Sequence, residues 1–299
     1  MDPFVTGGLI ALFGLVIAGT YDQSCTPPGT WWDPATGKEV AADAVIGQAA
    51  SASVVLLGER HDAAAHHRWQ LDVLTDLHAR KAHMALGFES FPRRVQPILD
   101  TWVSGALSEQ AFLEKVVWKD VWGFDPELYM PLFRFARDNG LPMVALNVER
   151  SLVRRTGKEG WASVPHDERE EMGDPARASA AYQSRLEAVL SAHAHGAGDP
   201  NIDQAAKRNR FVEAQLVWDR AMAEALAQAW KADTQRLVVG IVGQGHVDYG
   251  YGIPHQLADL GVRDVRVLLP WDKGEACAEP DEGGVFIADA VYTVDQSAD

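Results

Sequence analysis

The chain has 299 residues, 47% of them hydrophobic, and carries a formal net charge of -15 at pH 7. This length allows one large α/β domain or two smaller ones, and the hydrophobic content is sufficient for a sizeable core. The negative charge excludes unguided binding to nucleic acid or to an anionic membrane, because both would repel the chain.

The first 39 residues are expected to be a signal-like segment followed by an N-terminal arm. Residues 9–18 form an apolar stretch of signal-peptide length, too short to cross a bilayer comfortably as a helix. This stretch predicts export, although no positive charge precedes it and no clear cleavage site follows. The two cysteines, Cys25 and Cys277, would be able to pair in an oxidising compartment and link the two ends of the chain.

From residue 40 to residue 299 the pattern predicts one α/β domain with a parallel-rich central sheet flanked by helices. Apolar runs indicate buried strands at residues 54–57, 83–88, 142–146, 237–242, 264–269 and 290–294. Helices are expected at residues 63–80, from Pro92 onward, near 108–116 and at 126–139, with an aromatic loop at 118–124.

Residues 150–232 interrupt this alternation and predict a helical insertion that covers the strand edge as a lid. Its last part, residues 203–233, reads as one long helix with an apolar stripe. Gln215 falls on that stripe and Asp219 lies beside it. Because an unpaired buried polar group is costly, such residues more often serve a hydrogen-bond network than bind a ligand directly.

Short polar clusters follow four of the strand-like runs. They contain Glu59 and His61 after the first, Glu89 after the second, Asn147 after the third and His246 after the fourth. In a parallel sheet the carboxyl ends of the strands share one edge, so these residues are expected to converge there. That edge is the predicted ligand site.

Two kinds of chemistry fit Glu59, His61, Glu89 and His246. Imidazole and carboxylate together suit zinc, iron or manganese, and a site with fewer than four protein ligands leaves a position for water. The same residues suit general acid/base work without a metal, since each carboxylate can orient an imidazole and raise its pKa. The structural alternative is a helix cap at Glu59 and a turn residue at His246.

Other residues near the predicted edge carry weaker signals. His66 and His67 are expected to be solvated residues of a first helical turn. Trp122 lies in the aromatic loop, and loop aromatics beside a strand edge are suited to a flat apolar ligand.

Taken together, these motifs resemble the ChaN-like haem-binding uptake proteins, which belong to the wider superfamily of erythromycin esterases and the Tiki and TraB proteins. The resemblance covers residues 40–270 and rests on segments in the same order and spacing, namely 58–62 with 66–67 and Gln70, 87–89, 215–223, and 243–246 followed by 251–254.

The resemblance implies an exported bacterial protein of the periplasm or cell envelope that binds haem and acts in haem or iron uptake. It also implies a homodimer that buries paired haems, a tyrosine as axial ligand, and a functional link to an outer-membrane haem transport system. Matched motif by motif, the family positions fall on Glu59, His61, Asp62, Glu89 and His246.

Two functions therefore remain open, with a binding protein for some other flat or anionic ligand as a third. In the first, haem is held by Tyr249, Tyr251 or a histidine, aromatic residues such as Trp122 stack on the porphyrin, and Arg150 pairs with a propionate. In the second, the Glu and His residues activate water in an esterase or protease, with or without a metal.

Overall fold

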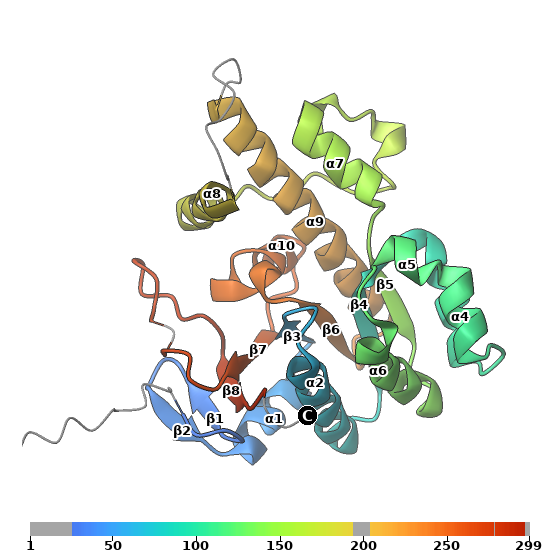
Figure 1. The fold of residues 1–299 in the computed structure, drawn as a ribbon, viewed down its shortest axis with the longest axis vertical. Helices are drawn as coiled ribbons and strands as arrows, with labels where there is room; N and C mark the ends of the chain where they lie inside the picture. Colours follow the sequence, from blue (N-terminus) through green and yellow to red (C-terminus); the bar gives the residue numbers. More distant parts are fainter. Residues whose placement is uncertain (1–25, 194–203, 278, 297–299) are drawn as a thin grey trace, which may run out of the picture.

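The computed structural model describes residues 26–193, 204–277 and 279–296. In this part of the chain eight strands form one sheet in the order β2-β1-β8-β7-β3-β6-β4-β5 (Figure 1). The strands from β8 to β5 are parallel to their neighbours, and β1 pairs antiparallel with β8 and with β2. The predicted parallel-rich α/β fold is confirmed.

The six predicted strands are confirmed within a few residues at each end, and all of them are largely buried. They are β3 (Val54–Glu59), β4 (Met84–Pro92), β5 (Met143–Asn147), β6 (Leu237–Gly243), β7 (Val265–Asp272) and β8 (Ala290–Val294). The described part of the predicted N-terminal arm adds a short hairpin, β1 (Trp31–Asp33) and β2 (Lys38–Val40), to the sheet. Cys25 and residues 9–18 lie outside the described residues, so the disulfide and the export signal stay predictions.

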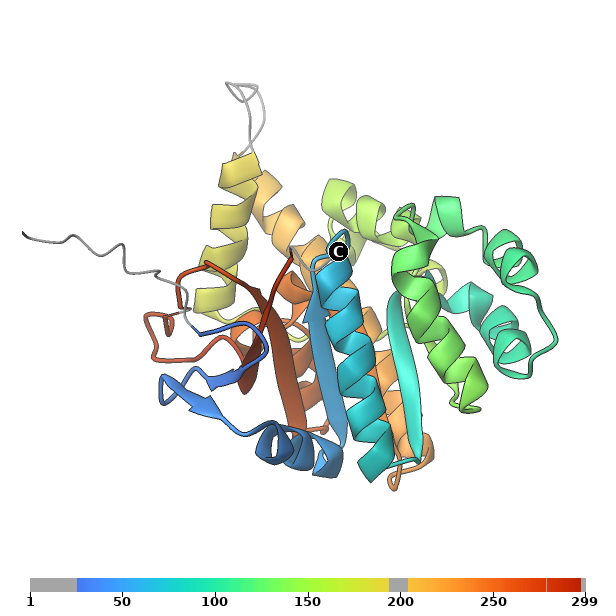
Figure 2. The same cartoon turned by 60° about the horizontal axis from the view of Figure 1, so that its bottom comes forward.

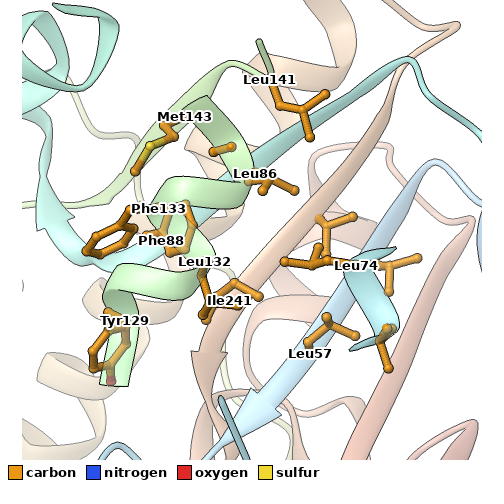
Figure 3. Close-up of a cluster of buried hydrophobic side chains, with 14 of the residues drawn as sticks. Leu57, Leu74, Leu86, Phe88, Tyr129, Leu132, Phe133, Leu141, Met143 and Ile241 are labelled. Atoms are coloured by element: carbon orange, nitrogen blue, oxygen red, sulfur yellow. The ribbon is translucent and has the colours of Figure 1, made fainter. Parts of the chain in front are cut away.

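Helices cover both faces of the sheet (Figure 2) because successive strand side chains point to opposite sides. Leu57, Leu86, Phe88 and Ile241 (Figure 3) face a core formed with α2 (Ala64–Arg80), α3 (Gln96–Val103) and α6 (Pro126–Asp138). Leu56 and its neighbours face the second core, which is covered by α9 (Gln204–Ala232) and α10 (Ile253–Asp259). Helix α1 (Ala42–Ser51) belongs to the first layer as well and packs beside α2.

Local signals explain where several helices begin and end. The Ser108 hydroxyl accepts a hydrogen bond from the amide of Ala111 and so caps α4 (Glu109–Val116). Asp125 caps α6 in the same way, with Pro126 in the first turn. Gly140, at φ 63°, ends that helix in the left-handed conformation that glycine tolerates best.

Two of the predicted elements are wrong. No helix begins at Pro92, because β4 continues through this residue and pairs it with Asn147 of β5; a short turn, η1 (Arg93–Val95), follows, and the proline of the first helical turn is Pro97 in α3. The aromatic segment 118–124 is not wholly a loop, because its first four residues form α5 (Trp118–Val121).

The predicted insertion contains α7 (Arg150–Glu159), the turns η2 (Trp161–Ser163) and η3 (His166–Glu168), α8 (Ala180–His193) and the long helix α9. Figure 1 shows α7 and α8 beyond the carboxyl ends of the strands, on either side of α9. Among the described residues, no helix has the length and hydrophobicity needed to span a membrane.

Candidate functional site

The strand order brings the predicted polar residues together. Strand β6 follows β5 in the chain but lies between β3 and β4 in the sheet, and Glu59 pairs in register with Gly243. The turns η4 (Gln244–His246) and η5 (Asp248–Gly250) follow β6, so His246 lies at the same edge and reaches the carboxylate of Glu89 at the end of β4. This is the edge of the sheet at which the sequence predicts the ligand site.

Glu59 and His61 form the first pair. Nδ1 of His61 lies 2.8 Å from Oε1 of Glu59, and the Tyr129 hydroxyl donates a hydrogen bond of 2.6 Å to the same oxygen. His67 lies behind them, with Nε2 at 3.2 Å from the carbonyl oxygen of His61 and Nδ1 at 3.2 Å from Oε2 of Glu59, although the last two atoms form no hydrogen bond. Glu59 is therefore a fixed, buried carboxylate that orients His61.

Aromatic rings pack against His61. Its ring centroid lies 4.6 Å from that of Trp122 and 5.3 Å from that of Phe124. Burial alone would lower the pKa of His61, but hydrogen-bonded Glu59 and nearby Glu89 raise it above its ordinary value. The side chain is still 28% exposed, and no hydrogen bond to Nε2 occurs among the described residues.

His246 lies between two carboxylates and forms the second group. Its Nδ1 is 2.6 Å from Oδ1 of Asp219, and its Nε2 is 3.4 Å from Oε1 of Glu89. Gln215 Nε2 lies 3.1 Å from the same Nδ1, and the Tyr182 hydroxyl donates a hydrogen bond of 2.7 Å to the other oxygen of Asp219. The structure thus places Gln215 and Asp219 in a buried network around His246.

The charges of this group follow from its burial. Burial would lower the pKa of His246, but Glu89 and Asp219 raise it to about 10. Burial would also raise the pKa of Glu89, but His246, His61 and the amide of Gly243, which donates at 2.6 Å, lower it to about 2. Burial dominates at Asp219 and raises its pKa. Glu89 and His246 therefore form the ion pair at neutral pH.

Gly243 is the point where the two groups meet. A Cβ atom on this residue would lie 2.8 Å from Cε1 of His61 and 3.4 Å from Oε2 of Glu89. Only glycine lets the backbone of β6 pass this close to both side chains.

The predicted tyrosines lie on the α8 side of this edge. The rings of Tyr249 and Tyr251 stack with centroids 5.5 Å apart, and Tyr251 also contacts Tyr182 at 5.8 Å. The Tyr251 hydroxyl donates to a carboxylate oxygen of Asp281, and the Tyr249 hydroxyl lies 3.4 Å from the carbonyl oxygen of Glu279. Tyr249 has a φ of 57°, a strained value for a residue with a side chain.

Arg185 of α8 completes this rim. Its guanidinium lies 5.0 Å from the Tyr249 ring centroid and pairs with the buried carboxylate of Asp248. Burial raises the pKa of Asp248 to about 6, although Arg185 opposes the shift.

Trp122 and Arg150 lie in a different part of the site. The Arg150 guanidinium is 5.7 Å from the Trp122 ring and donates a hydrogen bond of 3.3 Å to its carbonyl oxygen. Among the described residues no hydrogen bond or ring contact joins this pair to Tyr249 or Tyr251.

Several site residues were missed or misjudged in the sequence. His66 and His67 are not solvated but 2% and 4% exposed, because α2 packs its first turn under the strand edge. Tyr129, Tyr182 and Asp248 were not identified, since each is an ordinary residue of its segment until the chain folds.

Among the described residues, no group of three or more His, Cys, Asp or Glu side chains has an arrangement that could hold a metal ion. In the site, the carboxylates of Glu59, Glu89 and Asp219 each lie against a histidine.

The fold and the site define an α/β protein with paired Glu–His groups at the carboxyl edge of a parallel sheet. The sequence pattern of the family described as "Haem-binding uptake, Tiki superfamily, ChaN" matches residues 45–257. The chain belongs to this family. No curated protein matches it in sequence.

The first of three similar solved structures has the same fold as this chain. "Cofacial heme binding to ChaN of Campylobacter jejuni" is 18% identical, covers 88% of this chain and 95% of its own, and has a TM-score of 0.65. An erythromycin esterase in its open conformation is 13% identical, with 81% and 77% covered and a TM-score of 0.47. A toxin effector domain from Vibrio vulnificus is 15% identical, with 90% and 42% covered and a TM-score of 0.46.

Proposed function

We propose that the protein binds haem through Tyr251 or Tyr249 at the rim of the strand edge. Family membership supports haem as the ligand, and the state of His246 favours a tyrosine. Both ring nitrogens of His246 lie against buried carboxylates, so ligation by this imidazole would break an ion pair. The half-buried Tyr251 is the single observation that carries the proposal, because its phenol already donates to a carboxylate.

The donor chemistry of this rim fits haem. Bound haem would supply an iron that a phenolate oxygen can ligate. Asp281 Oδ2 is positioned to accept the phenol proton of Tyr251, while the Arg185 guanidinium beside Tyr249 offers a positive charge to a porphyrin carboxylate.

A haemin titration followed at the Soret band tests this function. The wild-type chain is expected to show a saturable, stoichiometric band, and Tyr251→Phe or Tyr249→Phe to weaken binding by about tenfold or more, the value of a lost ligand bond of roughly 1.4 kcal/mol. Tyr292→Phe is the matched control, because its ring packs on Trp31 away from the site. Unsaturable binding that no substitution changes would mean nonspecific adsorption of porphyrin.

The proposal includes a role in haem or iron uptake at the cell envelope, with a homodimer and an outer-membrane haem transport system as partners. The uptake role rests on the family description, whereas the envelope location, the homodimer and the transport partner rest on the resemblance stated for the sequence motifs. Fractionation of cells that express the full chain is expected to place it outside the cytoplasm, and sedimentation with haemin is expected to show a dimer.

Hydrolysis is the second candidate, and the Glu59–His61 pair favours it. A buried carboxylate orients Nδ1 of His61 at 2.8 Å, which leaves Nε2 to take a proton from water at the exposed side of the ring. His246, held protonated beside Glu89, would place a positive charge near a developing oxyanion. Haem binding alone requires neither arrangement.

Esterase and peptidase activity of the haem-free chain tests this candidate. We expect Glu59→Gln and His61→Gln to lower the rate constant by about 100-fold or more, the usual contribution of a general base. Because the pKa of His61 is raised, the rate is expected to increase as the pH rises through that pKa. Glu109→Gln, which removes an exposed carboxylate paired with Arg134, is the control. Equal activity in all variants would exclude the site as its source.

A further inference from the structure

A cavity of about 250 Å³ opens beside Glu89, between the end of β4 and the start of α7. It adjoins the candidate site, because Glu89 and Trp122 line it and Trp122 packs on His61, but the functions proposed above make no use of its arginines. Its lining also includes Ser90, Asp120 and Asn147, the first turn of α7, and three arginines, which are Arg94, Arg150 and Arg154.

The first turn of α7 offers unpaired backbone donors to this cavity. Glu149, the residue before the helix, makes no side-chain cap, and the amides of Arg150 and Ser151 donate no hydrogen bond among the described residues. The amide of Glu149 is already bonded to the Glu170 carboxylate at 3.1 Å. The two free amides and the helix dipole favour a negative group at this end.

Ser90 gives an independent indication of a ligand. Its side chain is only 3% exposed and lines the cavity, yet its hydroxyl has no hydrogen-bond partner. A buried hydroxyl without a partner is destabilising, and a ligand oxygen in the cavity would remove that cost.

The charges around the cavity leave one cation in excess. Glu149 pairs with Arg94 at 2.5 Å, and Glu89 pairs with His246. Two arginines of the lining then remain, Arg150 and Arg154, and the negative charge of the exposed Asp120 balances that of one of them. Arg154 is also exposed and has no ion pair or hydrogen bond among the described residues. A surplus of one positive charge suits a singly charged carboxylate.

We propose that this cavity binds the carboxylate of an organic acid through the α7 amides, Ser90, Arg150 and Arg154. The volume limits what can be enclosed. A cavity of about 150 Å³ accommodates benzene, so 250 Å³ encloses a small acid but not a porphyrin. A free small acid and a propionate that reaches in from haem present the same group.

Titration calorimetry with the haem-free full chain tests the cavity, with benzoate as the probe and benzamide as its neutral isostere. Benzoate is expected to bind saturably, and benzamide at least about tenfold more weakly, because only the anion pairs with arginine. Arg154→Gln is expected to weaken the affinity for benzoate by about tenfold, and Ser90→Ala by about threefold.

Arg155→Gln is the matched control, since it removes the same charge from the same helix at a residue paired with Glu159 and Glu168. The proposal is overturned if the binding of benzoate does not saturate or if benzamide binds equally well. It is also overturned if Arg155→Gln weakens the binding of benzoate as much as Arg154→Gln does.

Competition distinguishes the two sources of the carboxylate. If haemin displaces benzoate and haemin dimethyl ester does not, the cavity holds a propionate. If benzoate and haemin bind together without competition, the ligand is a free small acid. Both results support a carboxylate site, and both are independent of whether Tyr251 ligates the iron or the Glu–His pairs catalyse hydrolysis.

Discussion

His246 shows how burial assigns charge among neighbouring residues. Two carboxylates contact one imidazole, and the pKa of His246 is raised to about 10 while that of Glu89 is lowered to about 2. The pKa of Asp219, unlike that of Glu89, is raised, because burial is the larger effect at this carboxyl. On acidification Asp219 is therefore protonated before Glu89, and the Glu89–His246 ion pair persists over a wide range of pH.

The stability of the protein is expected to fall in alkaline solution. The ordinary pKa of 6.5 describes His246 in the unfolded chain, and the folded value is about 10. The contribution of His246 to the free energy of unfolding is therefore complete below pH 6.5 and is lost as the pH rises to about 10. His246→Gln is expected to lower the free energy of unfolding by about 3–5 kcal/mol at pH 6, as for other buried ion pairs that lose one partner.

Denaturant unfolding between pH 6 and pH 10 measures this dependence. The decline with pH should be shallower in His246→Gln than in the wild type. His255→Gln should keep the wild-type slope, because in the described part of the chain the His255 ring bonds only to the carbonyl oxygen of Arg177. Equal slopes in all three proteins would contradict the assignment.

At the scale of the element, the strands depend on close packing that glycine permits. A Cβ on Gly58 of β3 would lie 2.3 Å from Cδ2 of Leu269, and one on Gly87 of β4 would lie 2.6 Å from Cδ2 of Leu146. These leucine side chains occupy the space next to the glycine backbone that a larger side chain at residue 58 or 87 would need. Glycine is therefore required for the packing of these strands against their neighbours.

Gly58→Ala is expected to destabilise the protein by about 1–3 kcal/mol, the usual cost of overpacking a core. Gly245→Ala is the control, because among the described residues no atom outside its chain neighbours lies within 4 Å of the added Cβ. Chemical denaturation of both variants provides the measurement. A Gly58→Ala protein as stable as Gly245→Ala would show that Leu269 moves aside without cost.

Over the whole molecule, helices from distant parts of the chain complete the site. Tyr129 reaches Glu59 from α6, Asp219 reaches His246 from α9, and Tyr182 of α8 bonds to Asp219. Helix α8 packs on α9 through Tyr182 and Leu186, and Arg185 pairs with Asp248 beyond β6. Helix α8 is thus attached to the strand edge by polar contacts that involve the site itself.

Tyr182→Phe is expected to loosen α8 without unfolding the sheet. The lost hydrogen bond to a carboxylate is worth about 1.5–3 kcal/mol, so amide hydrogen exchange in α8 should accelerate by about tenfold or more. Exchange in β3 and β6 should not change, and Tyr292→Phe should leave α8 at its wild-type rate. Acceleration spread evenly over the sheet would instead mean global destabilisation.

The sequence by itself predicted the six strands from β3 to β8, most helix positions and the polar residues at the ends of the strands, but not the hairpin of β1 and β2. Buried parallel strands are continuous apolar runs, and the polar residues that end them, such as Glu59 and His246, need no long-range information to be recognised. Pro92 was misread because its fixed φ suits an extended strand end as well as a first helical turn.

Only the tertiary structure decided which of these residues form pairs. The placement of β6 between β3 and β4 results from the packing of the whole sheet, and no local pattern encodes it. It made His246 the partner of Glu89 and brought His61 against Gly243. Tyr129, Tyr182 and the cavity at α7 arise in the same way, because helix faces acquire partners only when the layers pack together.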